Sequence, residues 1–470
     1  MKKEEIRKYF DQIAGKRDRW KEKNRYYHDE IEKLLGFLVP GGASVLEVGC
    51  ATGDILAALD PASGKGIDLS EKMIELARAK YPRLRFESGD VESMVEGEPF
   101  DYIILSDVIG YLDDVQRAIG ELHKTTHERS RVIITYYNYL WEPVMRLAEA
   151  LRLKQRQPFL NWLAPADLDN LLRLAGFETV KRGERLLFPV YIPLISTVLN
   201  RYVAKLPFIR KLCLVHYLVA RPMPRGKKPD ARPTVSVIIP ARNEKGNIEN
   251  AVKRLPAFGG RTEIIFVEGH SKDGTFEEIE RVKAAHPERD IKIMKQDGKG
   301  KGDAVRKGLD AASGDILMIL DADLTVPPED LPKFYRALSS GAGDFINGSR
   351  LVYQLENESM RILNIFGNKF FGLMFSWLLD QRIKDTLCGT KALWKSDYEK
   401  IRRGRSFFGD FDPFGDYDLL FGAAKLNLKI VDLPIRYQAR VYGSTQISRF
   451  THGWLLLRMC FFAMRKIKFI

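Results

Sequence analysis

The 470-residue chain has few cysteines and no apolar run long enough to cross a membrane. Cys50, Cys213, Cys388 and Cys460 are far apart and form no C-x-x-C pair, which argues against a disulfide scaffold or a thiolate zinc site and fits a reducing cytosol. Residues 186–200 form a charge-free apolar stretch of only fifteen residues with two prolines, below the roughly 18 needed to span a bilayer. Because the N-terminus has no apolar core, we expect no signal peptide and a cytoplasmic protein.

The net charge of +13 arises in two short segments rather than over a generally basic surface. Residues 185–232 contain ten basic residues and one acidic residue, and residues 440–470 contain six basic residues and no acidic ones. Neither half is a basic nucleic-acid-binding module, so we expect no nucleic-acid partner. Both segments mix their basic residues with Leu, Ile, Phe and Val, which favours contact with a membrane surface. We therefore expect a peripheral protein on the cytoplasmic face of a membrane.

A segment rich in proline and basic residues, RPMPRGKKPDAR at 221–232, separates two halves of similar length. It predicts a linker between a first domain at 1–220 and a second at 233–470. In each half, apolar strand-like runs such as 45–48 and 235–240 alternate with helical segments. This alternation predicts two α/β domains, each with a mostly parallel sheet.

The first half places glycines and acids where predicted strands end. In VLEVGCATGDIL, residues 45–56, Glu47, Gly49 and Gly53 lie where a strand turns into a helix, and glycines allow the backbone to approach a ligand closely. Asp68 ends the next predicted strand, where a carboxylate is well placed to accept the hydroxyls of a ribose.

A third acid, Asp90, precedes Val91 after the third predicted strand. Over about residues 25–185 this arrangement resembles a class I S-adenosylmethionine-dependent methyltransferase with a Rossmann-like sheet. The resemblance implies that the glycine loop holds the methionine part of the cofactor, that Asp68 binds its ribose and that Asp90 faces its adenine. Ala51 replaces the middle glycine of the family's pattern.

Two alternatives concern this half. An NAD-binding site would require G-x-G-x-x-G and a pyrophosphate over a helix N-terminus, which the spacing of Gly49, Ala51 and Gly53 does not match. The half could also be a non-catalytic module that binds S-adenosylmethionine and regulates the second half. If this half is catalytic, its main contribution is to align the acceptor with the methyl group, because a sulfonium methyl group is already electrophilic. Position alone offers four candidates for a general base: Asp107, His123, Tyr136 and Tyr137.

The second half contains a paired-carboxylate motif, DAD, at the end of an apolar strand at 315–320. Asp321 and Asp323 provide hard oxygen ligands of the kind that Mg²⁺ or Mn²⁺ prefers. Such an ion would keep open positions for substrate phosphates and would neutralise a leaving diphosphate. A loop rich in glycine and lysine at 297–309, which includes Lys301, suits an anionic ligand at the start of a helix.

These motifs, in order, resemble the family 2 glycosyltransferases of GT-A fold, most closely the dolichyl-phosphate mannose synthases and related polyprenyl-phosphate sugar synthases. The resemblance covers about residues 233–450. It implies an inverting, metal-dependent transfer of a hexose from a nucleotide-sugar donor. The implied donor-binding residues are Pro240, Arg242, Glu244, Glu268, Ser271, Lys301, Asp321, Asp323, Arg350 and Arg440.

This half departs from the family's pattern at the acid pair after the second strand, because Gly269 follows Glu268. Thr325 occupies the position where mannose synthases offer a metal-contacting amide. Two classes of glycosyl acceptor are also compatible with the sequence. A hydroxyl acceptor would need a carboxylate base, for which Asp416 and Asp418 are candidates, whereas a lipid phosphate is already ionised.

The sequence thus predicts a bifunctional transferase, with a methyltransferase joined to a glycosyltransferase that acts on a polyprenyl phosphate or another membrane lipid. The alternative is a glycosyltransferase with a hydroxyl acceptor in glycolipid or cell-surface glycan synthesis, controlled by a non-catalytic S-adenosylmethionine-binding half.

Overall fold

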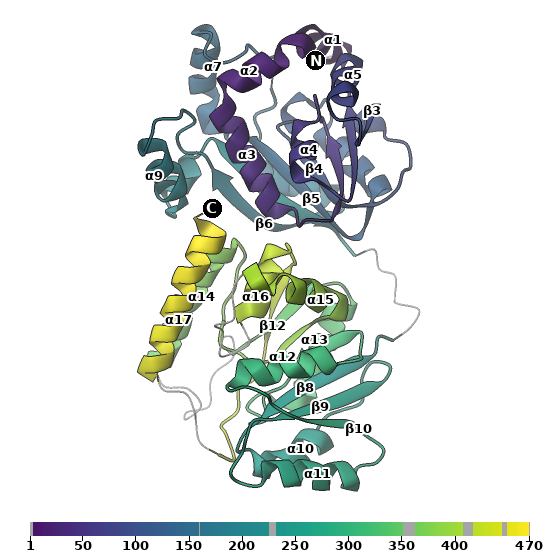
Figure 1. Ribbon diagram of the computed structural model, residues 1–470, viewed down its shortest axis with the longest axis vertical. Coiled ribbons are helices and arrows are strands. Elements are labelled where there is room, and N and C mark those ends of the chain that lie inside the picture. Colours follow the sequence, from purple (N-terminus) through teal and green to yellow (C-terminus); the bar gives the residue numbers. More distant parts are fainter. Residues whose placement is uncertain are drawn as a thin grey trace. The chain divides into compact units, whose positions relative to one another are not determined.

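The computed structural model describes residues 3–158, 160–224, 232–350, 362–407, 417–443 and 449–469. The chain divides into two compact units, residues 1–223 with the last two residues, and residues 224–468 (Figure 1). The boundary lies inside the segment that was expected to be a linker. The last strand of the first unit runs to Pro222, so Arg221 and Pro222 belong to a sheet and not to a linker.

The first unit is built on a seven-stranded sheet in the order β3-β2-β1-β4-β5-β7-β6. Strands β1 to β5 are parallel, and β7 is antiparallel to both β5 and β6. The strands are β1 (Ser44–Val48), β2 (Ser63–Asp68), β3 (Arg85–Ser88), β4 (Phe100–Ser106), β5 (Thr126–Tyr137), β6 (Phe177–Arg185) and β7 (Val215–Pro222).

Helices cover both faces of this sheet, because each central strand is apolar on both sides. The helices are α1 (Lys3–Ile13), α2 (Arg17–Lys23), α3 (Arg25–Leu38), α4 (Asp54–Leu59), α5 (Glu71–Lys80), α6 (Val115–Glu121), α7 (Glu142–Ala150), α8 (Pro165–Leu174) and α9 (Ile195–Arg201). On one face Val45 and Ile104 pack with α3, α4 and α5, and on the other Leu46 and Ile103 pack with α6 and α8.

The second unit contains another seven-stranded sheet, in the order β10-β9-β8-β11-β13-β12-β14. Strands β10, β9, β8 and β11 are parallel, β13 is antiparallel to both β11 and β12, and β14 is parallel to β12. The strands are β8 (Val235–Ala241), β9 (Thr262–Glu268), β10 (Asp290–Lys295), β11 (Ile316–Ile319), β12 (Phe345–Ser349), β13 (Lys391–Trp394) and β14 (Ile430–Pro434).

Helices again cover both faces of the second sheet. They are α10 (Ile248–Lys253), α11 (Thr275–Ala285), α12 (Lys301–Ala311), α13 (Leu331–Ser339), α14 (Ile362–Leu379), α15 (Lys395–Arg403), α16 (Tyr417–Lys425) and α17 (Arg449–Ala463). Helices α14 and α17 lie side by side (Figure 1). Each buries part of its apolar surface and leaves large side chains exposed, among them Leu373 and Trp454.

Candidate active sites

The turn from β1 into α4 depends on backbone conformations that few residues adopt. Gly49, Ala51 and Gly53 all have positive φ, of 71°, 47° and 79°. A Cβ atom at Gly49 would overlap the side chain of Val108, and one at Gly53 would lie 2.5 Å from the ring of Phe86. Glycine is therefore required at both ends of the turn, whereas Ala51 keeps its left-handed conformation with space for a methyl group.

Asp68, at the end of β2, holds this turn in place. One of its carboxylate oxygens accepts the backbone N–H of Ala51 at 2.8 Å, and the other accepts the N–H of Ser70 at 2.9 Å. Burial raises the pKa of Asp68, although these two backbone donors oppose the shift. The structure thus places Asp68 beside the glycine turn.

Glu47 lies deeper, at the end of β1, and is only 2% exposed. Its carboxylate accepts the backbone N–H of Leu56 at 3.0 Å, within the first turn of α4. Burial raises the pKa of Glu47 to about 8, so this side chain holds a proton at neutral pH unless a cation lies beside it.

Asp90, after β3, is paired with the N-terminal helix α1. The ammonium of Lys3 lies 2.6 Å from Asp90 and 2.9 Å from Glu92. Burial would raise the pKa of Asp90, but Lys3 and the backbone N–H of Glu92 outweigh it and hold that pKa below its ordinary value. Helix α1 is fixed a second time by Asp11, which accepts a hydrogen bond from the Ser70 hydroxyl at 2.5 Å.

These elements enclose a cavity of about 570 Å³. Its lining includes most of the predicted positions, namely Glu47, Gly49, Ala51, Asp68, Asp90 and Val91. Gly53 is not among the lining residues and instead shapes the turn. Helices α1, α2 and α3, for which no sequence motif predicted a part in the site, contribute Phe10, Arg17 and Tyr27 to the lining. Their positions depend on contacts with residues far away in the chain, such as the pair of Lys3 with Asp90.

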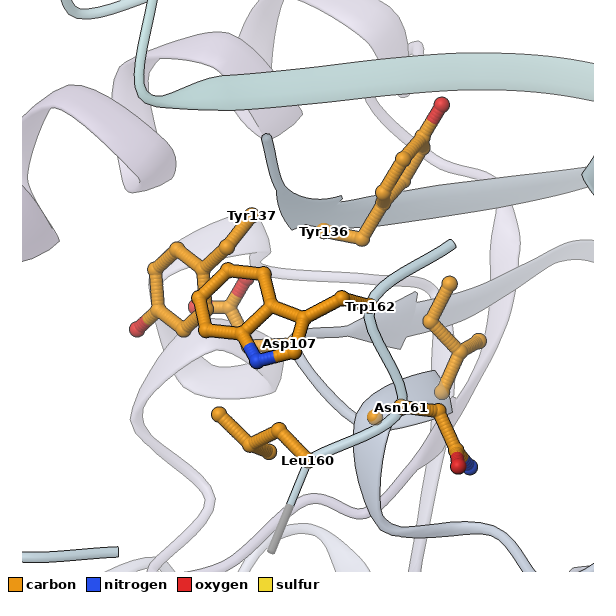
Figure 2. A pocket seen from close by; sticks show the side chains of 8 residues that line it. Asp107, Tyr136, Tyr137, Leu160, Asn161 and Trp162 are labelled. Carbon is orange, nitrogen blue, oxygen red and sulfur yellow. The ribbon is translucent and has the colours of Figure 1, made fainter. Parts of the chain in front are cut away.

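The structure separates the four candidates for a general base. Asp107 and Tyr137 line both the large cavity and a small one of about 20 Å³ beside it, where the indole of Trp162 lies next to them (Figure 2). Asp107 accepts hydrogen bonds from the Tyr27 phenol and, at 3.3 Å, from the Thr135 hydroxyl, and burial raises its pKa. Tyr136 reaches only the small cavity.

His123 has a packing role. Its ring stacks on Phe177 with centroids 4.2 Å apart, and Nε2 lies 2.8 Å from the carbonyl oxygen of Ala175. It is not among the residues that line either cavity. Asp107 and Tyr137 are therefore the two candidates that line the large cavity.

In the second unit, Asp321 follows β11 and forms an ion pair with Lys301, at the start of α12, at 2.6 Å. Burial opposes ionisation of Asp321, but the Lys301 ammonium outweighs it and holds the pKa of Asp321 below its ordinary value. The backbone at Gly389 passes so close that a Cβ atom there would overlap both side chains. A larger residue at this position would therefore displace the side chains of Asp321 and Lys301.

Asp323 has a different cationic partner. The Arg440 guanidinium lies 2.6 Å from Asp323 and 3.2 Å from Glu244. Burial raises the pKa of Glu244 to about 7 although Arg440 lowers it, and the neighbouring Asp323 adds to the rise. Thr325 donates its hydroxyl to Asp323 at 2.8 Å, so this side chain orients the carboxylate. The structure thus joins Glu244, Asp323 and Arg440, which are 79 and 117 positions apart along the chain.

The loops after β8 and β9 are held together by hydrogen bonds between side chains and backbone. Ser271 Oγ accepts the N–H of Asn243 at 2.9 Å, and Glu268 accepts the N–H of Ser271 at 2.5 Å. Pro240 lies within the last residues of β8, and Arg242 is exposed beside Gly269. These predicted positions therefore lie at the carboxyl ends of two adjacent parallel strands or in the loops that follow them.

Arg350 has a partner that the sequence analysis did not anticipate. Its guanidinium forms two hydrogen bonds with Asp385, at 2.7 and 2.8 Å, with side-chain exposures of 11% and 0%. Burial would raise the pKa of Asp385, but the guanidinium holds it below its ordinary value. This arrangement gives Arg350 a role in fixing the segment that carries Gly389.

Asp418, at the start of α16, faces two arginines and is 6% exposed. Its carboxylate lies 3.5 Å from Arg405 and 3.9 Å from Arg306. Asp416, the other candidate base, lies outside the described residues. Within the described part of the chain, no group of three or more His, Cys, Asp or Glu side chains is placed to hold a metal ion. The two carboxylates of the DAD motif, Asp321 and Asp323, are thus the metal ligands to consider.

Comparison with protein families assigns both halves. A model described as a methyltransferase domain matches residues 19–182, and the model of glycosyl transferase family 2 matches residues 236–402. The chain therefore contains a methyltransferase domain followed by a family 2 glycosyltransferase domain. The expected fold classes are confirmed, a Rossmann-like sheet in the methyltransferase domain and a GT-A arrangement in the glycosyltransferase domain.

Relatives of the glycosyltransferase domain include a dolichol-phosphate mannosyltransferase from Pyrococcus furiosus, 31% identical over 45% of this chain and 59% of its own length. One of the same name from Saccharomyces cerevisiae is 39% identical over 24% of this chain and 44% of its own. The chain thus spans about half the length of each. The first half is similar to a solved structure of a SAM-dependent methyltransferase from Thermotoga maritima, a possible histamine N-methyltransferase. The match covers 46% of this chain and 99% of the other chain, with 18% sequence identity and a TM-score of 0.38.

Among the helices that the structure describes, none combines the length and the apolar character needed to cross a membrane.

Proposed function

We propose that the chain is a bifunctional transferase. Its first domain would transfer a methyl group from S-adenosylmethionine, and its second would transfer a hexose from a nucleotide-sugar to a polyprenyl phosphate. The observation that carries the glycosyl-transfer proposal is the position of Asp321 and Asp323, at the end of β11, beside Lys301, Arg440 and the loops after β8 and β9. Both relatives are dolichol-phosphate mannosyltransferases by name, which favours a lipid-phosphate acceptor.

The two carboxylates fit a divalent metal ion. Asp321 is ionised at neutral pH, because Lys301 keeps its pKa low, and carboxylate oxygens are the ligands that Mg²⁺ and Mn²⁺ prefer. A metal held by only two protein groups keeps positions for the oxygens of a diphosphate, and it would supply charge to the leaving group. Lys301 and Arg440 lie where they would face the same phosphates.

The surroundings of Asp418 favour a lipid phosphate over a hydroxyl acceptor. A hydroxyl acceptor requires a carboxylate that is available to take a proton. Asp418 instead faces Arg306 and Arg405. A lipid phosphate is already ionised near neutral pH, with a second pKa of about 6, and needs no such base.

The methyltransferase proposal depends on the cavity between the glycine turn and α1–α3. S-Adenosylmethionine would supply an electrophilic methyl group on a sulfonium. Asp68 and Asp90 lie where they would accept hydrogen bonds from its ribose and adenine, as the family resemblance implies. Glu47 would become ionised beside the positive charge. For a hydroxyl acceptor, Asp107 is the carboxylate in the cavity that would take up the proton.

Both activities can be tested in the full-length protein. Purified protein, Mn²⁺, labelled nucleotide-sugars and a polyprenyl phosphate should give a labelled lipid. Asp321→Asn should abolish this transfer, whereas Glu280→Gln, which changes an exposed carboxylate on α11 in the same domain, should not. Transfer that persists in Asp321→Asn would disprove the metal assignment.

Asp68→Asn should prevent binding of S-adenosylmethionine, measured by calorimetric titration. Asp29→Asn, in a carboxylate on α3 that is 44% exposed and not among the cavity-lining residues, should leave binding unchanged. If Asp68→Asn also stops glycosyl transfer, the first domain regulates the second. If glycosyl transfer continues, the two activities are independent.

A further inference from the structure

The methyltransferase domain exposes an unusual concentration of apolar side chains in two stretches, 139–153 and 190–212. Leu147 and Leu151 on the first are 59% and 60% exposed, and Leu194 and Phe208 on the second are 81% and 87% exposed. Single exposed apolar side chains are ordinary on protein surfaces, but contiguous groups of them mark contact with a partner or a membrane. We call these two stretches the apolar rim.

The two stretches are joined by hydrogen bonds, although they are far apart in sequence. The indole N–H of Trp141 donates to the carbonyl oxygen of Leu212 at 2.8 Å. The side-chain amide of Asn138 donates to the carbonyl oxygen of Lys211 at 2.9 Å. The second stretch is also tied to α3, because Asn200 donates to the Tyr26 hydroxyl at 2.9 Å. The apolar rim is therefore a fixed part of the domain surface.

The apolar rim borders the cavity that would hold the methyl donor. Val144, Leu153 and Val190 line the cavity and are also 50%, 57% and 57% exposed. Helix α7 turns other residues, Met145 and Ala148, into the cavity. The cavity thus has a polar end, formed by Glu47 and Asp68 in the last residues of β1 and β2 and by Asp90 after β3, and an apolar end that continues onto the exposed surface.

We propose that the apolar rim docks on an anionic lipid bilayer and that the methyl acceptor is an amphipathic lipid, which enters the cavity while its chain stays in the bilayer. The partner is argued from charge as well as apolarity, since residues 190–212 contain four basic residues and no acidic one. Arg201 and Lys211 are exposed within that stretch. Apolar side chains flanked by basic ones bind anionic membrane surfaces.

This proposal rests on the proposed methyltransferase activity and names its substrate class. For a lipid with a hydroxyl group, the hydroxyl oxygen would form the new bond to the methyl carbon. The electron pair of the broken carbon–sulfur bond would stay on sulfur, which becomes a neutral thioether. The hydroxyl proton would pass to the Asp107 carboxylate. No further co-reactant is needed.

A local probe separates this surface from any membrane contact of the glycosyltransferase domain. All four native cysteines are buried, so a thiol introduced by Phe208→Cys can be labelled selectively with a polarity-sensitive fluorophore. Val95→Cys is the matched control, because Val95 is 85% exposed in the same domain and is not among the cavity-lining residues.

With vesicles of phosphatidylcholine and phosphatidylglycerol, the emission of the Phe208→Cys label should shift to the blue and that of the Val95→Cys label should not. The Phe208→Glu variant should bind these vesicles roughly tenfold more weakly, the loss expected from removing one inserted aromatic side chain.

An unshifted Phe208→Cys label on protein that floats with the vesicles would overturn the proposal. A shift that appears without vesicles and grows with protein concentration would also overturn it, since it would indicate a second copy of the chain as the partner. Equal shifts with vesicles of phosphatidylcholine alone would refute the requirement for anionic lipid.

The substrate class is tested by methyl transfer from labelled S-adenosylmethionine to a membrane lipid extract. Phe208→Glu should lower this transfer at least severalfold without changing the affinity for S-adenosylmethionine, and Val95→Glu should lower neither. Label that appears only on water-soluble acceptors would overturn the lipid assignment. Wild-type protein that fails to bind S-adenosylmethionine would instead refute the proposed methyltransferase function, so the two failures are distinguishable.

Discussion

The ion pair of Arg350 with Asp385 offers a test of whether Arg350 is structural or contacts the substrate. The guanidinium donates to both oxygens of Asp385, at 2.7 and 2.8 Å, and both side chains are nearly inaccessible to water. Asp385 also accepts the backbone N–H groups of Arg350 and Leu387, each at 3.0 Å. The pair therefore connects the end of β12 to the segment that carries Gly389 past the DAD motif.

Arg350→Met would remove the cation and leave a buried carboxylate. Breaking a buried pair by removing one partner costs about 3–5 kcal/mol, because the remaining charge has lost its compensation. Two backbone donors still face Asp385, so we expect a value near the lower end, about 3 kcal/mol. Replacing both partners, as Arg350→Met with Asp385→Asn, removes the orphaned charge. The double variant should recover about 1–3 kcal/mol relative to the sum of the single changes.

The measurement is chemical or thermal unfolding, with the transition of the glycosyltransferase domain followed separately from that of the methyltransferase domain. Arg254→Met is the matched control, since Arg254 also forms two hydrogen bonds to one carboxylate, Glu329, at 2.8 and 2.9 Å. That pair is 36% and 50% exposed and should be worth less than about 1 kcal/mol. If Arg350→Met destabilises the domain no more than Arg254→Met, or only raises KM for the donor, the structural role of Arg350 is refuted.

The pH dependence gives an independent check. The folded-state pKa of Asp385 is lowered, so the pair contributes its full stability above the pKa of an unfolded aspartate, about 3.9. That contribution should be lost as the pH falls through the lower pKa of the folded state. In Arg350→Met, burial raises the pKa of Asp385 and no guanidinium lowers it. The loss of folding stability on acidification should therefore become smaller.

Three further predictions concern the two sites. Gly389→Ala should abolish glycosyl transfer in a folded protein, since the added Cβ would overlap Asp321 and Lys301. Circular dichroism would check that the variant is folded, and the donor assay would measure its activity. Wild-type activity would contradict this prediction. Lys301→Met should raise the pKa of Asp321, because the ammonium that lowers this pKa is lost. The affinity of the variant for Mn²⁺, followed by electron paramagnetic resonance, should then weaken as the pH falls below neutral. An affinity that does not change with pH would show that Lys301 does not control the pKa of Asp321. Burial raises the pKa of Glu47 to about 8, so the stability of the ligand-free methyltransferase domain should fall as the pH rises from about 4 to about 8. Glu47→Gln should remove this slope in calorimetry, and an unchanged slope would assign it to other groups.

The strands of both sheets were largely predictable from sequence where they are parallel and central. Such strands are covered on both faces, so they appear as short continuous apolar runs, as in Val235–Ala241. Strand β6, with the sequence FETVKRGER, gave no comparable signal because polar residues dominate it. Strand β7 extends to Pro222, so its last residues looked like the start of a linker.

The candidate sites were predictable to the extent that they follow strand ends. Asp68 approaches the glycine turn and Asp321 approaches Lys301 because the carboxyl ends of parallel strands share one edge of a sheet. Long-range partners were not predictable, since no local pattern connects Lys3 with Asp90 or Arg440 with Asp323. Arg350 shows the limit most clearly, because a basic residue at a strand end suits a diphosphate as well as it suits a buried aspartate.

The cationic partners of the acids suggest how ligands would bind in both domains. Asp90, Asp321 and Asp323 each lie 2.6 Å from a cation of the chain itself, on Lys3, Lys301 and Arg440 respectively. A metal ion that enters between Asp321 and Asp323 must therefore share these carboxylates with two cations or displace them. The released Lys301 and Arg440 would then be available to a diphosphate, which brings the negative charge that they need. Metal and nucleotide-sugar should consequently bind with positive cooperativity, because each removes the electrostatic cost of the other.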